Sequence, residues 1–345
     1  MNVLFRTDAS VAIGSGHVMR CLALAHALCK LGAHCDFACR ITAGHLADVI
    51  RSQSFNVLPL PELLTTQAAD ATATLAGLTQ NYTLLVVDHY ALSADYCRQL
   101  RARCQHVMQI DDLANRTYDC DLLLDQNLLP NAEQRYSMLV PAQCKVLAGP
   151  AYALLREEFY QAYAARNSLK ILIGFGGSDE HNLTRLAIEA FTKLKIPGLT
   201  ADIVIGASNP WHAEIQQLTA SLPNTRLHVQ CNYMAKLMHQ ARLMLGGGGA
   251  SHWERCISAL PGLVVTVAGN QQAATAYLDQ LGACVWLGQA ADMSAEFFAE
   301  QLCYYLSQPA LLDSMGQTAA GLIPAAAGTP LVVETILKTL NNGHP

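Results

Sequence analysis

The chain has 345 residues, more than the ~250–300 at which one hydrophobic core usually stops growing, so we expect two domains. Apolar residues make up 52% and charged residues 14% of the sequence, which excludes a disordered chain. The net charge of −5, without a basic block, argues against nucleic acid or an anionic membrane as a partner. Mean hydropathy is +0.20, but no stretch offers the ~18 uninterrupted apolar residues of a membrane span, so we expect a soluble protein.

The first eight residues carry charge and lack a long apolar run, so we expect no secretion signal and a cytoplasmic location. In a reducing cytoplasm the twelve cysteines are expected to be free and mostly buried thiols. Examples in apolar runs are Cys21, Cys29, Cys256 and Cys303. Neither the cysteines nor the twelve histidines have the spacing of metal ligands, so no metal is expected.

In the first half of the chain, short apolar runs alternate with segments of helical period, which is typical of parallel α/β layering. Strands are predicted over 2–6, 34–40, 83–88, 105–110 and 120–125, and helices over 17–31 and 43–52. This alternation predicts a doubly wound, Rossmann-like lobe over residues 1–150. Residues 151–167 are expected to form a linker helix.

The same rhythm restarts in the second half of the chain. Strands are predicted over 169–173, 201–206, 225–229, 242–245, 262–267 and 283–286, followed by helical sequence over 287–345 with a polar tail from Asn341 to Pro345. The predicted fold class is therefore α/β, with a second Rossmann-like lobe over 168–345 and the two lobes facing a cleft. Ligands of open α/β sheets lie beyond the carboxyl ends of the strands, so the loops after the strands are where we look for function.

The first such loop runs from Gly14 to Arg20 and enters the first long helix. Gly16 permits close approach of a ligand, and the helix start presents unpaired N–H groups. His17 would then stay neutral and serve as a general base, while Arg20 shares its helix face and would hold an anion or a carboxylate. The alternative for His17 is a packed histidine on an amphipathic helix.

Two glycine-rich loops in the second half are candidate phosphate cradles. The first contains Gly177 and Ser178 within Gly174–Asp179; it lacks the Gly-Lys-Ser/Thr of an ATP-binding loop, and a tight turn without ligand is the alternative. The second has four consecutive glycines, Gly246–Gly249, between a strand and a helix, which a diphosphate at the helix start would explain. Its remaining members are Ala250 and Ser251.

Polar residues beside these loops complete the candidate site. Glu254 lies about one turn into the helix, where it would accept hydrogen bonds from a ribose diol or simply be solvated. Asn270 and Gln271 follow another strand of the same lobe. In the first lobe Asp88, Tyr90, Asp111 and Asp112 follow apolar strands, where a carboxylate needs a partner; helix capping is the alternative for the three aspartates.

Taken together, these segments resemble the UDP-2,4-diacetamido-2,4,6-trideoxy-β-L-altropyranose hydrolase family of pseudaminic acid biosynthesis. The matching segments span residues 3 to 275 and are Arg6–Asp8, Gly14–Arg20, Val87–Tyr90, Ile110–Asp112, Tyr152–Arg156, Gly176–Asp179 with Asn182, Gly246–Arg255, and Asn270–Gln271.

The resemblance implies a GT-B fold, similar to the lipid II-forming N-acetylglucosaminyltransferase, and hydrolysis of a UDP-sugar without metal or cofactor. Carried over by position, His17 would activate water for attack at the anomeric carbon with inversion, and Asn270 would contact the substrate near the reacting end. The turn Gly248–Ser251 with Ser178 would hold the diphosphate, and Glu254 the ribose. The full substrate-binding set would be Asp8, Gly16, Arg20, Asp88, Tyr90, Asp111, Asp112, Gly177, Ser178, Gly248, Gly249, Ala250, Ser251, Glu254 and Gln271.

Two departures from the family pattern stand out. Ala250 and Ser251 replace an expected Ser-Thr pair, so one candidate phosphate-binding hydroxyl is missing, and the sequence beyond about 290 has no assigned role. A UDP-sugar glycosyltransferase, a UDP-sugar 2-epimerase and a non-catalytic nucleotide-sugar-binding protein remain alternatives. Apart from the UDP-sugar substrate we expect no nucleic acid or membrane partner, and a monomer or weak oligomer.

Overall fold

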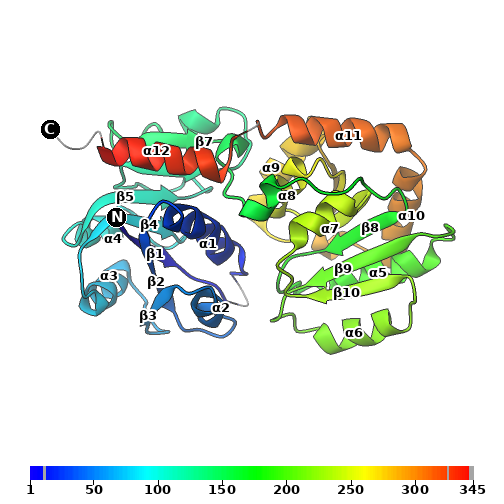
Figure 1. Ribbon diagram of the computed structural model, residues 1–345, viewed down its shortest axis with the longest axis horizontal. Helices are drawn as coiled ribbons and strands as arrows, with labels where there is room; N and C mark the ends of the chain where they lie inside the picture. Colours follow the sequence, from blue (N-terminus) through cyan, green and yellow to red (C-terminus); the bar gives the residue numbers. More distant parts are fainter. Residues whose placement is uncertain (11–12, 325, 342–345) are drawn as a thin grey trace. The chain divides into compact units, whose positions relative to one another are not determined.

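The computed structural model describes residues 1–10, 13–324 and 326–341, which form two compact units (Figure 1). The first unit comprises Met1–Arg156 with Ala325–Pro345, and the second comprises Glu157–Pro324. Each unit is built around one fully parallel sheet with helices on both faces. The predicted α/β class with two Rossmann-like lobes is therefore confirmed. Of the predicted polar tail, residues 342–345 lie outside the described residues.

The sheet of the first unit has the strand order β3-β2-β1-β4-β5-β6-β7. Its strands are β1 (Asn2–Thr7), β2 (His34–Arg40), β3 (Asn56–Leu60), β4 (Tyr82–Asp88), β5 (Cys104–Ile110), β6 (Leu122–Asp125) and β7 (Lys145–Ala148). Its helices are α1 (Gly16–Cys29), α2 (Ala47–Ser52), α3 (Gln67–Gly77), α4 (Ala94–Leu100) and α12 (Thr329–Asn341), with 3-10 turns η1 (Ala132–Tyr136) and η2 (Pro150–Tyr152).

Apolar residues on both faces of the central strands build two cores in this unit. Along β4, Leu84 and Val86 pack into the core shared with α1, whereas Leu85 and Val87 pack into the core on the opposite face. A strand buried on both faces reads as a continuous apolar run, which is why β4 and β1 are visible in the sequence.

The sheet of the second unit has the strand order β10-β9-β8-β11-β12-β13. Its strands are β8 (Lys170–Gly174), β9 (Thr200–Ile205), β10 (Thr225–Val229), β11 (Leu243–Gly247), β12 (Gly262–Thr266) and β13 (Val285–Gln289). Its helices are α5 (Leu183–Lys193), α6 (His212–Ala220), α7 (Met234–Gln240), α8 (Ser251–Ile257), α9 (Gly269–Gln280), α10 (Ala295–Leu306) and α11 (Pro309–Gly321), with 3-10 turns η3 (Glu157–Tyr160) and η4 (Ala290–Asp292). Ile171, Ile173 and Phe298 lie in a hydrophobic core of this unit.

The predicted boundary of the second lobe needs correction, because α12 belongs to the first unit. The sequence analysis assigned all of 168–345 to the second lobe, but α12 lies beside α1 in the first unit (Figure 1). Its apolar stripe packs into the same core as α1. The members of that stripe are Val332, Val333, Ile336 and Leu340.

The predicted linker helix over 151–167 is also wrong, because only the short turns η2 and η3 form there. Leu155 satisfies its backbone groups with a side chain rather than with a helix. Its N–H donates to Thr329 Oγ1 at 2.8 Å, and the hydroxyl of Thr329 donates to the carbonyl of Leu155 at 2.7 Å. Elements that the sequence analysis did not identify are β3, β7, α3 and α4.

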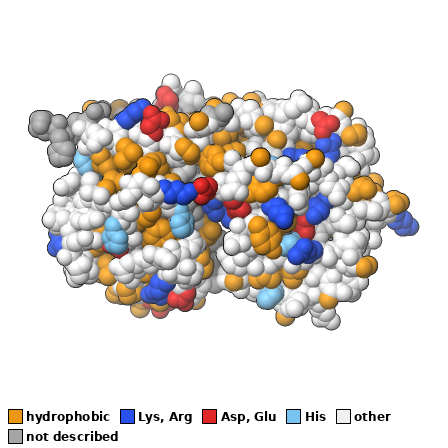
Figure 2. All heavy atoms as spheres, in the orientation of Figure 1, with side chains coloured by type: hydrophobic (Ala, Val, Ile, Leu, Met, Phe, Trp, Pro, Cys, Tyr) orange, Lys and Arg blue, Asp and Glu red, His pale blue; other side chains and the backbone are white. Residues whose placement is uncertain are grey.

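All twelve cysteines are free thiols, and eight of them are buried, as expected. Cys303 is an exception to the predicted burial, since it lies exposed on α10, and Cys29 is half-buried. Within the described ranges, none of the helices combines the length and apolar character needed to cross a bilayer. Basic and acidic side chains stand beside one another on the face of the molecule shown in Figure 2.

Candidate active site

In the first unit, the strand order reverses between β1 and β4. The chain adds β2 and β3 on one side of β1, and then returns to add β4 on the other side. Such a switch point opens a crevice at the carboxyl ends of the two strands. His17 follows β1 as the second residue of α1, and Asp88 is the last residue of β4. The predicted loop and one of the predicted aspartates are therefore brought together.

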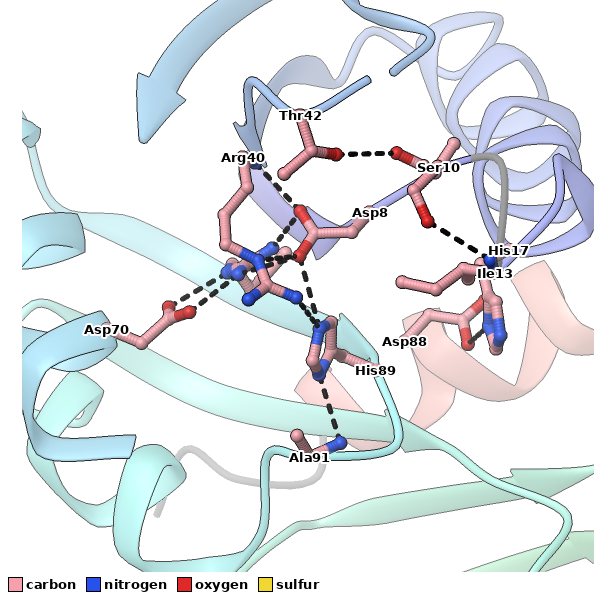
Figure 3. A network of polar contacts seen from close by, with 12 residues as sticks. Asp8, Ser10, Ile13, His17, Arg40, Thr42, Asp70, Asp88, His89 and Ala91 are labelled. Carbon is pink, nitrogen blue, oxygen red and sulfur yellow. Dashed lines mark hydrogen bonds and ion pairs between the residues drawn. The ribbon is translucent and has the colours of Figure 1, made fainter. Parts of the chain in front are cut away.

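A short hydrogen bond joins these two side chains: His17 Nδ1 lies 2.6 Å from Asp88 Oδ1 (Figure 3). Asp88 is 1% exposed and His17 9% exposed. Arg20 Nη2 also lies near Nδ1, but at 3.2 Å, whereas the carboxylate lies at 2.6 Å and can only accept, so we assign the ring proton to Nδ1, which donates to Asp88. With the proton on Nδ1, Nε2 has a lone pair to accept a proton, which is what a general base needs.

Arg20 orients the same carboxylate from the next turn of α1. Its Nε donates to Asp88 Oδ2 and its Nη2 to Oδ1, each at 2.6 Å. Burial raises the pKa of Asp88, but the guanidinium of Arg20 and the ring of His17 outweigh burial and hold this pKa below its usual range. Arg20, predicted to hold an anion or a carboxylate, thus holds a carboxylate of the protein itself.

Tyr90 and Asp112 extend this cluster. The ring of Tyr90 meets that of His17 edge-on, with 4.7 Å between centroids. Its hydroxyl donates to Asp112 Oδ2 at 3.1 Å, and Asn127 Nδ2 donates to the same oxygen at 3.3 Å. Burial, followed by the charge of Asp112, raises the pKa of Tyr90, so the phenol stays protonated at neutral pH.

Asp8, predicted to bind substrate, lies within a buried ion network (Figure 3). Arg6 donates to both of its oxygens, at 2.6 and 3.1 Å, and Arg40 donates through its backbone N–H and its Nε at 2.8 and 2.6 Å. His89 Nε2 lies 3.1 Å from Oδ2. Asp8 is 2% exposed, so these donors surround a buried carboxylate.

Asp111 is likewise occupied by its own loop. Its Oδ1 accepts from the N–H groups of Leu113 and Ala114, both at 2.9 Å, and from the hydroxyl of Tyr118 at 2.6 Å. Arg116 Nη2 lies 2.6 Å from Oδ2. The structure therefore favours the capping interpretation for Asp111, whereas Asp88 and Asp112 belong to the cluster around His17.

In the second unit, the strand order reverses between β8 and β11, and both predicted glycine loops lie at this switch point. Gly246 pairs with Gly174 across the two strands. A Cβ atom on Gly246 would come within 2.5 Å of the Gly174 carbonyl, and one on Gly206 within 2.4 Å of the Gly177 carbonyl. Glycine is needed at both positions because the backbones of the loops touch.

The turn Gly248–Ser251 offers free backbone donors. In the part of the chain that the structure describes, the N–H groups of Gly249 and Ala250 donate to no acceptor, whereas that of Gly248 donates to the Val265 carbonyl at 2.9 Å. Gly249 has a φ of +125°, a conformation that favours glycine. The hydroxyl of Ser251 donates to the Gly247 carbonyl at 2.9 Å, so its proton is already used.

The remaining predicted residues of this unit lie on α8, at the start of α9 and in the loop after β8. Glu254 is half-buried on α8, and Asn270 is exposed in the first turn of α9. Gln271 accepts from the Val267 N–H at 2.9 Å, and its carboxamide lies 3.4 Å from the Cβ positions of Gly248 and Gly249. Ser178 is half-buried in the loop after β8.

Sequence reasoning missed several polar residues of both clusters: Arg40, His89, His252, Arg255 and Thr275. All but Arg40 are buried. Four of them lie on helices or strands and His89 directly follows β4, but a buried histidine or arginine has the same sequence signature as an exposed one. The motif Trp253-Glu254-Arg255 was a signal for α8, without indicating that the arginine points inward.

Comparison with known proteins identifies the family. The UDP-2,4-diacetamido-2,4,6-trideoxy-β-L-altropyranose hydrolase of Campylobacter jejuni is 32% identical to this chain over 250 residues, which cover 71% of the chain and 84% of that relative. The chain belongs to this hydrolase family. No protein-family model matches the chain.

Solved structures agree on the fold of this family member. MurG of Acinetobacter baumannii is 20% identical with a TM-score of 0.61, covering 98% of this chain and 99% of that one. The spinosyn rhamnosyltransferase SpnG is 16% identical with a TM-score of 0.67, covering 98% and 100%. At such identities the likeness shows the fold alone, which is the two-lobed α/β fold of GT-B glycosyltransferases.

Proposed function

We propose that this member of the hydrolase family cleaves UDP-2,4-diacetamido-2,4,6-trideoxy-β-L-altropyranose to free sugar and UDP, with His17 as the base that activates water. The observation that carries the proposal is the pair His17–Asp88 at a switch point, with Nδ1 donating and Nε2 left as a proton acceptor. Membership of the family supports the choice of substrate.

In the proposed reaction, His17 Nε2 removes a proton from water while the water oxygen attacks the anomeric carbon. The bond between that carbon and the β-phosphate oxygen breaks, and its electron pair leaves with UDP. The imidazolium that forms is stabilised by Asp88, whose carboxylate stays ionised because Arg20 donates to both oxygens. A single displacement of this kind inverts the anomeric centre.

UDP can leave without a protonating carboxylic acid, because a terminal phosphate has a pKa of about 6. The paired carboxylates of ordinary glycosidases are then unnecessary. The negative charge that develops on UDP needs donors instead. We assign these to the N–H groups of Gly249 and Ala250 and to Ser178, with Glu254 on the ribose and Asn270 near the reacting end.

The proposed reaction can be tested by incubating the protein with the UDP-sugar in ¹⁸O-labelled water and following the products by NMR and mass spectrometry. We expect free sugar and UDP, with the label on the anomeric oxygen and with the inverted anomer formed first. Label on the phosphate of UDP would overturn attack at carbon. Sugar transfer that requires an added acceptor alcohol would indicate a glycosyltransferase, and an epimer that keeps its UDP would indicate an epimerase.

A further inference from the structure

Arg255 is a buried cation in the second unit that has no acidic partner. Its side chain on α8 is 2% exposed, and Nη1 donates to the carbonyls of Leu260 and Ala283 at 3.2 and 2.9 Å. Nη2 lies 3.1 Å from His252 Nδ1. Among the described residues, no carboxylate lies within ion-pair distance of this guanidinium. A Cβ on Gly262 would come within 2.6 Å of its Nε, so glycine at that position makes room for it.

The arginine fixes the direction of a chain of hydrogen bonds. A guanidinium only donates, so His252 Nδ1 accepts and the ring proton resides on Nε2. Nε2 then donates to Thr275 Oγ1 at 2.9 Å, and the hydroxyl of Thr275 donates to the Gln271 carbonyl at 2.8 Å. Burial, together with the nearby charge of Arg255, lowers the pKa of His252, which keeps the ring neutral.

This chain, Arg255–His252–Thr275, lies directly against the glycine-rich turn. Thr275 Oγ1 and His252 Nε2 are 3.0 and 3.3 Å from the position that a Cβ on Gly248 would occupy. Its other end is the backbone of Gln271, in the first turn of α9. The polar chain therefore connects the two segments to which we assign phosphate binding and the reacting end.

We propose that Arg255 is a positioning residue whose missing counter-charge is the diphosphate of the bound nucleotide, and that it holds the turn and α9 in register through His252 and Thr275. The inference rests on the proposed nucleotide site. A buried charge without a partner is unfavourable, and an anion at the turn would offset that cost. At the low effective dielectric of such a site, one unscreened positive charge changes the affinity for a diphosphate by roughly tenfold or more.

The charge is tested by calorimetry and NMR titration of Arg255→Met and Arg255→Lys with UDP and with uridine. We expect Arg255→Met to bind UDP roughly tenfold more weakly while uridine affinity is unchanged. Arg255→Lys should recover most of the loss. Equal losses for UDP and uridine, or no loss for UDP, would overturn the counter-charge.

The first test of the hydrogen-bond chain uses the unmodified protein, so it does not depend on the folding of a variant. In the ¹⁵N spectrum of the unmodified protein, His252 should show a neutral ring protonated at Nε2 from pH 5 to 8. A ring protonated at Nδ1, or one that titrates in this range, contradicts the chain. Thr275→Ser should keep UDP affinity and Thr275→Val should lower it; equal affinities would contradict the role of the hydroxyl. If the unmodified protein binds no UDP, the nucleotide site itself fails, and the ring shifts still decide the chain.

Discussion

Asp88 Oδ1 lies 2.6 Å from His17 Nδ1, so the residue that ends β4 determines which ring nitrogen of the proposed base is free. In Asp88→Asn, an NH2 group replaces one carboxylate oxygen. This group cannot accept, so the amide cannot keep all the hydrogen bonds that His17 and Arg20 donate to the two oxygens of Asp88. We expect kcat to fall by about 10²–10⁴-fold, with UDP affinity unchanged. Steady-state kinetics and calorimetry on one preparation measure both. Activity within a few-fold of the unmodified protein would remove Asp88 from the mechanism.

Replacing His17 by phenylalanine removes the base but keeps a ring of similar size against Tyr90. His17→Phe should fold, bind UDP and turn over about 10²–10⁴-fold more slowly. Turnover followed by NMR and UDP binding by calorimetry provide the two measurements. If His17→Phe remains fully active, water is activated elsewhere and the proposed reaction must be abandoned.

Glu254 is assigned to the ribose hydroxyls, and this assignment predicts a selective effect. Glu254→Ala should weaken UDP binding by about 1–3 kcal/mol, because the diol loses its acceptor. The matched ligand is 2′,3′-dideoxy-UDP, for which the variant and the unmodified protein should have the same affinity. Calorimetry with both ligands decides, and an unchanged affinity for UDP would show that Glu254 does not bind the ribose.

The Asp8 network predicts that the first unit is sensitive to acid. Burial raises the pKa of Asp8, but His89, Arg6 and Arg40 together bring it below its usual range. A carboxyl with a depressed folded pKa contributes stability above its unfolded pKa of about 4, and this contribution is lost as the pH falls. The free energy of unfolding should therefore decrease steeply below about pH 4.

Variants isolate this contribution of Asp8. Asp8→Asn should destabilise the protein by about 3 kcal/mol at pH 7, and the difference from the unmodified protein should shrink as the pH falls. Asp48→Asn is the control, because its side chain is 85% exposed and pairs with Arg51 at the surface; it should change stability by less than about 1 kcal/mol. Denaturant unfolding between pH 7 and pH 3 provides the comparison. Parallel pH curves for Asp8→Asn and the unmodified protein would contradict the prediction.

The close approach of Gly206 to the Gly177 carbonyl predicts that a single methyl group disturbs the proposed phosphate loop. In Gly206→Ala, the added Cβ would lie 2.4 Å from that carbonyl, so the loop carrying Ser178 must shift. We expect a loss of about 1–3 kcal/mol in stability and weaker UDP binding. Gly321→Ala is the control, since nothing lies within 4 Å of its added Cβ and it ends a helix. Thermal unfolding and calorimetry should separate the two variants; identical behaviour would show that the loop accommodates the methyl group.

The sequence predicts elements whose apolar runs are continuous and misses those whose runs are interrupted. The strand predicted over 34–40 has the bounds of β2, whose five middle residues are all buried, whereas the run of β3 is interrupted by the exposed Pro59. The apolar stripe of α12 was readable, but a helical period does not specify which sheet the stripe covers. That choice depends on the fit against α1, a contact between residues about 300 positions apart.

The candidate site was predictable to a similar extent. Loops after strands indicated His17, Asp88 and the glycine turn, because the topology places such loops at one edge of a sheet. The sequence could not show that Asp8 accepts from Arg40 of another strand, or that Asp111 is held by residues of its own loop, among them Tyr118 and Arg116. Which donors reach a carboxylate is a property of the folded state, and what sets Asp88 apart is that one of its donors is the ring of His17.

Because α12 returns to the first unit, that unit is assembled from both ends of the chain. The second unit lies wholly within the segment between its two parts. During synthesis the later-made unit can therefore finish folding while the earlier one still lacks a helix, which reverses the usual N-terminal-first order. Until Val332, Val333 and Ile336 emerge, the apolar face of α1 that they cover remains open to solvent or to a chaperone.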